Sequence, residues 1–134
     1  MKRTYAIDGG HFSTLEEFFD EIGHVLIPGC AWGKNLDAFN DILRGGFGTP
    51  EEGFVLRWEN SAISRQRLGY PETARQLRAR LEKCHPANRE RVAEAIEAAE
   101  AQTGPTVFDW LVEIIQDHGP GGAEPEDGVE LVLA

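Results

Sequence analysis

Three short segments of this chain have strand-like patterns, and longer amphipathic segments separate them. Residues 3–8 alternate in polarity, residues 54–58 form an apolar run, and residues 129–134 read VELVLA. Strands that are joined through helices are most simply parallel, because a parallel pair needs a long crossover connection. The pattern therefore predicts an α/β fold, in which helices cover a small three-stranded parallel sheet. The order of the three strands does not follow from the sequence.

The intervening segments have the spacing of amphipathic helices. A capping box of Ser13 and Glu16 begins the first helix, which ends at Pro28. Asn35 is the N-cap of a second helix over 35–44, and Gly45 ends it. Further helices are predicted over 71–83, over about 88–101, and over 107–118 after an N-cap at Thr106.

The length and composition indicate a single globular domain. A chain of 134 residues with 41% hydrophobic side chains is long enough to bury one core, so residues 1–134 are expected to form one domain. No apolar run reaches the roughly 18 residues of a membrane span, and the N-terminus has no signal-like apolar region. Cys30 and Cys84 form no metal-binding or redox motif. We therefore expect a soluble, cytoplasmic protein with no membrane contact.

The net charge of −10 favours a basic protein as the partner. It argues against direct binding of nucleic acid, since polyphosphates are bound by Lys and Arg surfaces. The charge is uneven, with −5 over residues 1–64, +5 over residues 65–91 and −10 over residues 92–134. Two interpretations of the basic 65–91 segment remain open. It either folds against acidic neighbours as an ordinary solvated face, or it forms a second contact surface.

The segment 32–48, WGKNLDAFNDILRGGFG, carries two acidic residues on one helical face. Leu36, Phe39 and Leu43 form an apolar stripe that is expected to face the core. Asp37 and Asp41 lie four residues apart on the other side, where like charges cost the helix about a few tenths of a kcal/mol. Such a pair suits a cationic partner, although exposed helix carboxylates often serve only solubility.

Other kinds of site find little support. The GGFG at 45–48 follows a helix and lacks the lysine of a phosphate-binding loop, so no nucleotide site is predicted. The histidines lack the spacing and the neighbouring carboxylates of a zinc site, so no metal is predicted and each is expected at the surface or at a helix cap: His11, His24, His85 and His118. An acid–base enzyme using Asp37, Asp41 and Glu113 is the remaining alternative.

The residues Gly33, Asn35, Leu36, Asp37, Ala38, Asp41 and Leu43 fit the pattern G-x-N-L-D-A-x-x-D-x-L. With the IDG turn at 7–9, the strand FVLRW, the segment TVFDWLVEII and the terminal GVELVLA, this pattern resembles the barstar family, which comprises intracellular inhibitors of barnase-type ribonucleases. The resemblance is strong over 1–60 and 105–134. The segment 61–104 is an extended helical segment that is longer than in compact members.

The resemblance implies a three-stranded parallel sheet with helices, and an inhibitor that plugs the ribonuclease active site with its second helix and the preceding loop. It implies that Asp41 enters the phosphate-binding pocket, with Asp37 beside it and Glu113 as a flanking acid. The other partner-binding residues it implies are Ala31, Gly33, Asn35, Leu36, Asn40, Gly45 and Gly46. Ala31, Asn40 and Gly46 stand where aromatic contacts are expected, so the target is expected to differ from barnase.

The resemblance further implies no catalysis and no cofactor. The expected partner is a basic ribonuclease or a related ribonuclease-like toxin domain. The alternative is a barstar-fold interaction module that does not inhibit a ribonuclease and contacts another protein through its basic 65–91 segment.

Overall fold

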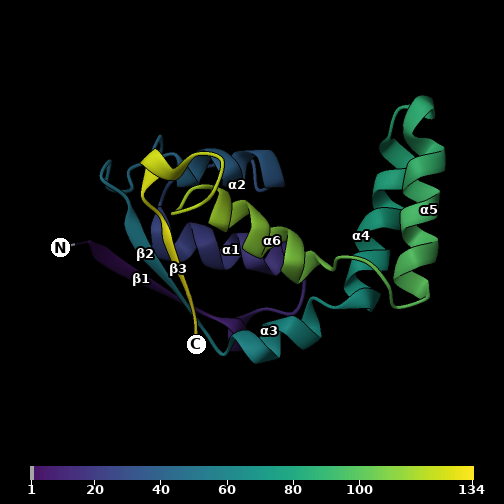
Figure 1. Ribbon diagram of the computed structural model, residues 1–134, viewed down its shortest axis with the longest axis horizontal. Helices are drawn as coiled ribbons and strands as arrows, with labels where there is room; N and C mark the ends of the chain where they lie inside the picture. Colours follow the sequence, from purple (N-terminus) through teal and green to yellow (C-terminus); the bar gives the residue numbers. More distant parts are fainter. Residues whose placement is uncertain (1) are drawn as a thin grey trace.

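A central strand, β2 (Phe54–Glu59), pairs in parallel with one strand on each side (Figure 1). The computed structural model describes residues 2–134. β1 (Arg3–Asp8) pairs with the first side of β2, and β3 (Glu130–Leu133) pairs with the other, so the order is β1-β2-β3. The predicted three-stranded parallel sheet is confirmed, and the structure adds the strand order. Both outer strands are edges of this sheet.

The helices are α1 (Leu15–Leu26), α2 (Leu36–Leu43), α3 (Ser61–Arg67), α4 (Tyr70–Lys83), α5 (Arg89–Glu100) and α6 (Val107–Asp117). Single 3-10 turns lie at Gly9–His11, Pro86–Asn88 and Pro125–Asp127. α3 is not among the predicted helices, because its segment SAISRQR has no apolar periodicity. Asn60 begins α3 in a left-handed conformation, at φ 55°, and its side chain makes no capping hydrogen bond.

The N-terminus of α1 differs from the prediction by one residue. Thr14, and not Ser13, is the N-cap, and its side chain accepts the Glu17 N–H at 3.1 Å. The Glu17 carboxylate in turn accepts the Ser13 N–H at 2.8 Å. Thr14 directly precedes Leu15, which is the first buried residue of the helix, so the cap lies where the apolar face begins.

The core is built around Trp58 of the central strand, which is fully buried. The rings of Phe12, Phe18 and Phe108 lie 5.1–6.0 Å from the Trp58 ring, between centroids. The Trp58 Nε1 donates to Ser64 Oγ at 2.9 Å, which satisfies the only polar atom of the indole. This bond also explains why Ser64 is fully buried in a helix that lacks an apolar stripe.

The α4–α5 hairpin projects from the sheet and its covering helices (Figure 1). Its two helices bury a small cluster of their own, made of Ala74, Leu77, Val92, Ile96 and Ala99. At the base of the hairpin, Thr73 Oγ1 accepts the Val107 N–H at 2.8 Å, and the Tyr70 hydroxyl donates to Gly104 O at 2.9 Å. These bonds tie the hairpin to the start of α6.

Glu72 makes a further connection between the hairpin and α1. Its buried carboxylate accepts the Leu15 N–H at 2.9 Å, and Arg75 and Gln76 donate to it. Burial opposes ionisation of Glu72, but the hydrogen bonds from Arg75, Gln76 and Leu15 outweigh burial and hold its pKa below the ordinary value. The ionised carboxylate therefore stabilises the attachment of the hairpin.

We expect Glu72→Gln to lower the free energy of unfolding by about 1–3 kcal/mol at neutral pH, since a buried charge-assisted network loses its acceptor. Because the folded-state pKa of Glu72 is lowered, its contribution is present above the ordinary value of 4.5 and is lost as pH falls through the folded value. Urea unfolding should therefore show a difference between Glu72→Gln and wild type that shrinks in acid. Glu82→Gln, which changes an exposed residue of the same helix, is the control. Equal stability of Glu72→Gln and wild type at pH 7 would contradict this role.

Candidate functional site

The helix α2 is fixed at both ends by the residues that the sequence predicts. Asn35 has an extended backbone, and its Oδ1 accepts the Ala38 N–H at 2.8 Å. After Leu43 the chain leaves the helix, and Gly45 takes the left-handed conformation at φ +94°, which favours glycine. Phe39, Ile42 and Leu43 are buried, and Leu36 is half-buried. The predicted amphipathic helix is confirmed.

The other side of α2 is exposed and carries Asp37 and Asp41. Asp37 has no ion-pair or hydrogen-bond partner among residues 2–134. The carboxylate of Asp41 accepts a hydrogen bond from Arg44 Nη1 at 2.7 Å. This i,i+3 pair, which is not among the sequence-based predictions, partly balances the negative charge of Asp41.

Arg44 also joins the end of α2 to the loop after α6. Its Nε and Nη2 donate to the two carboxylate oxygens of Glu124 at 2.8 and 2.6 Å. Such a two-bond pair between a guanidinium and a carboxylate has a defined geometry. The hydrogen bonds from Arg44 are the main reason that the pKa of Glu124 falls to about 2. Arg44 therefore stays anchored whether or not it also contacts Asp41.

Asn40 belongs to a partly buried network and not to the open face of α2. The ring nitrogens of His118 hydrogen-bond to Asn40 Oδ1 at 2.6 Å and to Asp127 Oδ2 at 2.7 Å. His118 is the C-cap residue of α6, so the predicted position at a helix cap is confirmed, but its side chain is fully buried and does not lie at the surface. The network connects α2, the end of α6 and the loop before β3. We conclude that Asn40 positions α2.

A cluster of potential metal ligands forms part of the same network. The donor atoms of His118, Glu124 and Asp127 lie within 4.8 Å of one another, so the prediction that the histidines have no neighbouring carboxylates is wrong for His118. These are residue types that bind divalent cations. However, Arg44 occupies both oxygens of Glu124, and both ring nitrogens of His118 are hydrogen-bonded. The arrangement is that of a closed hydrogen-bond network.

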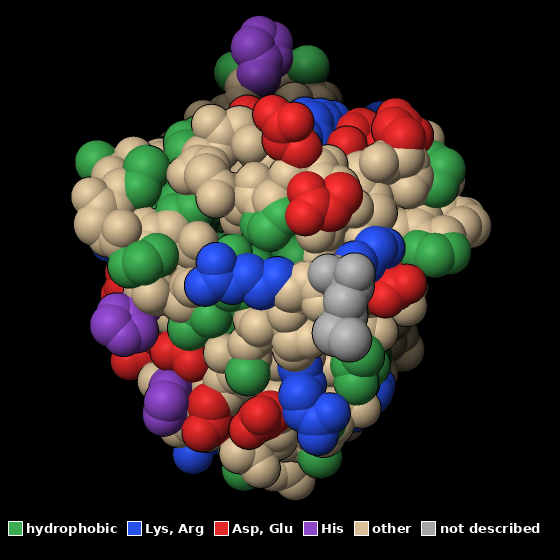
Figure 2. All heavy atoms as spheres, turned by 90° about the vertical axis from the view of Figure 1, so that its left-hand side faces the viewer, with side chains coloured by type: hydrophobic (Ala, Val, Ile, Leu, Met, Phe, Trp, Pro, Cys, Tyr) green, Lys and Arg blue, Asp and Glu red, His purple; other side chains and the backbone are tan. Residues whose placement is uncertain are grey.

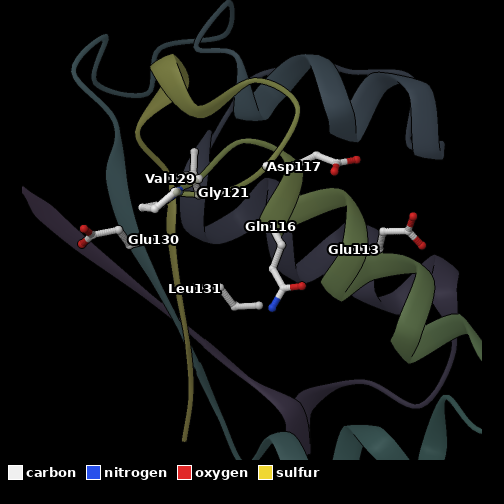
Figure 3. Close-up of a pocket in the computed structure, with 10 residues that line it drawn as sticks. Glu113, Gln116, Asp117, Gly121, Val129, Glu130 and Leu131 are labelled. Carbon is white, nitrogen blue, oxygen red and sulfur yellow. The ribbon is translucent and has the colours of Figure 1, made fainter.

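Glu113 lies on α6, near a groove of about 480 Å³ between α6 and β3. Figure 3 shows Gln116 and Leu131 pointing toward each other across this groove, whereas the carboxylates of Glu113 and Asp117 point away from β3. Asp117 follows Glu113 by one helical turn on the same side of α6, and α6 packs against α2. Asp117 is thus a second acidic residue beside Glu113 that is not among the predicted site residues. Its spacing of four residues from Glu113 in the sequence could have identified it.

The three carboxylates of the enzyme alternative do not share a pocket. Asp37 lines a cleft beside α1 and α4, Glu113 lines the groove beside β3, and Asp41 lines neither. All three residues are exposed. Neither of these two hollows therefore brings the three carboxylates together, as an acid–base site that uses all three would need.

The loops flanking α2 are exposed at Ala31, Gly33 and Gly46. Trp32 is half-buried and packs against Phe19, with ring centroids 5.6 Å apart. Phe47 is half-buried against the main core. The aromatic side chains nearest to α2 in the sequence therefore pack inward, and the face that carries Asp37 is mainly polar.

Most arginines of the 65–91 segment have partners within the fold. Arg75 pairs with Glu72 and Glu16, and Arg78 pairs with Glu100 at 2.8 Å. The Arg65 guanidinium lies 4.6 Å from the Phe108 ring centroid, and Arg67 donates to Gly10 O at 3.1 Å. These contacts favour the interpretation that the segment folds against its neighbours.

The side of the molecule turned away from the hairpin carries mixed charges. Figure 2 shows acidic and basic side chains next to each other on this side, with hydrophobic side chains scattered among them. This side is therefore not a surface of one sign that would attract a strongly basic partner.

We expect Asn40→Ala to destabilise the protein by about 1–3 kcal/mol, because one nitrogen of the buried His118 ring loses its partner. Asp37→Ala, on the exposed side of the same helix, should change stability by less than about 0.5 kcal/mol. Urea unfolding of both variants checks this difference. An unchanged stability of Asn40→Ala would show that the network does not hold α2.

We expect the Glu124 carboxyl to titrate with a pKa of about 2 in carbon-detected NMR, and Arg44→Gln to return this pKa toward the ordinary 4.5. Because the pKa is lowered on folding, ionised Glu124 adds stability above pH 4.5, and this contribution is lost as pH falls toward about 2. Lys34→Gln removes an exposed cation elsewhere and serves as the control. An unchanged Glu124 titration in Arg44→Gln would contradict the assigned cause.

Comparison with known proteins gives one family. The family model described as Barstar (barnase inhibitor) matches residues 2–119, a span that includes α2, its preceding loop and Glu113. No curated protein sequence matches the chain. Within residues 2–134, none of the helices is long and apolar enough to cross a membrane.

Proposed function

This chain belongs to the barstar family, and we propose that it is an inhibitor that binds and blocks the active site of a basic, barnase-type ribonuclease or a related toxin domain. In this proposal Asp41 and Asp37 are the main contacts, with Glu113 as a flanking acid. Ala31, Gly33, Asn35, Leu36, Asn40, Gly45 and Gly46 form or support the surrounding surface. The protein performs no catalysis of its own and needs no cofactor.

The physical basis is imitation of the substrate. A ribonuclease holds a phosphodiester between cationic side chains, so its empty site is a concave, positively charged pocket. A carboxylate presents oxygen acceptors to the same donors, and charge-assisted hydrogen bonds of this kind are strong. The net charge of −10 would further speed the encounter with a basic protein.

The observation that carries the proposal is an exposed acidic pair on a helix that is fixed along its length. The Asn35 cap and Gly45 define the ends of α2, and Phe39 and Ile42 are fully buried in the core. The network through Asn40 holds the partly buried side of the helix. The carboxylates are therefore positioned before the partner arrives, which lowers the ordering cost of binding.

The pair between Asp41 and Arg44 is compatible with this role. A ribonuclease cation that takes the Asp41 carboxylate would displace Arg44 from it. Arg44 would keep both of its bonds to Glu124, so no charge would be left without a partner. Asp41 can therefore exchange an intramolecular cation for an intermolecular one at low cost.

The polar character of the exposed face of α2 indicates how the target ribonuclease would bind. Ala31, Asn40 and Gly46 supply no aromatic side chain, whereas aromatic residues are common among the strongest contacts of protein interfaces. Binding should therefore depend more on charge pairs and weaken strongly with salt. We infer a target other than barnase itself.

We also propose that residues 1–134 act as one domain, with 61–104 as its extended helical segment. An interaction module without ribonuclease inhibition is the weaker candidate, since most arginines of the 65–91 segment contact neighbouring residues of the chain.

The test is titration of the protein into a panel of purified barnase-type ribonucleases and related ribonuclease-like toxin domains while RNA cleavage is followed. We expect stoichiometric inhibition of at least one enzyme, and inhibition should weaken as salt rises. Asp41→Ala should weaken inhibition by about 30-fold or more, equivalent to about 2 kcal/mol, a range for which the barnase–barstar pair is itself a standard example.

Glu97→Ala is the matched control, because it removes the same charge from the exposed side of α5. Asp41→Ala should change the free energy of unfolding by less than about 0.5 kcal/mol, since its pair with Arg44 is exposed. Equal weakening by both variants would show that net charge, and not the Asp41 position, drives binding. Failure to inhibit any enzyme of the panel would refute the proposal.

A further inference from the structure

A cleft separates the N-terminal end of α2 from the projecting hairpin. Its volume is about 460 Å³, and its walls are Lys34–Asp37 on one side and Gln76 and Arg80 of α4 on the other. Leu15, Glu16 and Phe19 of α1 form the floor. In Figure 1 the hairpin projects from the rest of the molecule beyond α2, on the side away from the sheet. A partner bound to the exposed face of α2 would therefore meet the hairpin as a second wall.

Two charges of opposite sign remain unpaired in this cleft. Glu16 is paired with Arg75, and Lys34 pairs with Asp20 at 3.0 Å. By contrast, neither Asp37 on one wall nor Arg80 on the other has an oppositely charged partner within residues 2–134. The cleft thus presents a carboxylate and a guanidinium to the same bound partner.

Arg80 is held in position although it has no carboxylate partner. Its guanidinium lies 5.5 Å from the centroid of the Trp110 ring, an arrangement in which the ring attracts the cation. Trp110 is half-buried and also packs against the apolar cluster of the hairpin. The planar guanidinium therefore keeps its donors available for a bidentate contact to a carboxylate.

We propose that the α4–α5 hairpin is a second arm of the inhibitor, and that Arg80 determines specificity by pairing with a carboxylate of the bound ribonuclease. This inference rests on the proposed function. The occupant of the cleft is a surface loop of the ribonuclease, with a cation that meets Asp37 and an acid that meets Arg80. The cleft is continuous with the proposed binding face, because Asn35, Leu36 and Asp37 belong to both.

The selectivity follows from the positive charge of Arg80. An acidic inhibitor attracts basic ribonucleases in general, so attraction alone discriminates poorly among them. The Arg80 cation repels a ribonuclease that has a basic side chain facing it, and it binds more tightly to a ribonuclease that has a carboxylate there. With Arg80 present, fewer of the basic ribonucleases that could pair with Asp37 and Asp41 would therefore bind tightly.

The test compares Arg80→Glu with Arg78→Glu, using the ribonuclease of the panel that wild type inhibits most strongly. Both variants change the net charge equally and lie on the same helix, but Arg78 faces α5, where it pairs with Glu100 and does not line the cleft. We expect Arg80→Glu to raise the dissociation constant by about tenfold or more and Arg78→Glu by less than about threefold. Arg80→Gln, which adds no negative charge, should show a smaller loss in the same direction.

Circular dichroism of each variant checks that the helices are intact, and Arg91→Glu on α5 is a second control of equal charge change. If Asp41→Ala weakens binding but Arg80→Glu and Arg80→Gln bind like the controls, the inference about the hairpin is overturned and the proposed function stands. If wild type inhibits none of the enzymes, the proposed function fails, and the inference fails with it.

Discussion

Trp58 packs the central strand of the sheet against the helices that cover it. Its strand, β2, pairs with both other strands, and its ring meets aromatic side chains that precede α1, lie in α1 and lie in α6. Phe18 continues this cluster to Phe39 of α2, with ring centroids 5.3 Å apart. The orientation of the acidic helix is therefore set by the same core that sets the sheet. Its outward face can carry charge without a role in folding, since the inward face supplies the packing.

The sequence predicts the local elements well where a short-range rule decides them. The strands, the cap at Asn35 and the left-handed Gly45 depend on neighbours within a few residues, and the structure confirms each. The shift from Ser13 to Thr14 shows the limit of such rules, because adjacent Ser and Thr compete for one cap. α3 was missed for another reason. Its segment has no apolar periodicity, and its buried Ser64 is held by a long-range hydrogen bond from Trp58.

The part of the candidate site that was not predicted consists of long-range contacts. Arg44 and Glu124 lie 80 residues apart, and Asn40 and His118 lie 78 apart, so spacing in the sequence cannot reveal either pair. Both connect α2 to the segment that follows α6. The acidic pair itself was recognisable, whereas the groups that hold α2 and balance Asp41 were not. The same holds for the hairpin. The sequence does not show that Arg75 and Arg78 form ion pairs within the chain whereas Arg80 does not, because these pairs depend on the folded arrangement.

In the proposed complex, the carboxylates of α2 occupy the phosphate site of the ribonuclease. Competition between the protein and a nucleoside 3′-monophosphate for the same ribonuclease tests this placement. We expect the apparent dissociation constant of the complex to rise in proportion to the nucleotide concentration, well beyond the effect of sodium chloride at equal ionic strength. If the nucleotide and the chloride weaken binding equally, the protein binds outside the phosphate site, which would contradict the proposed function.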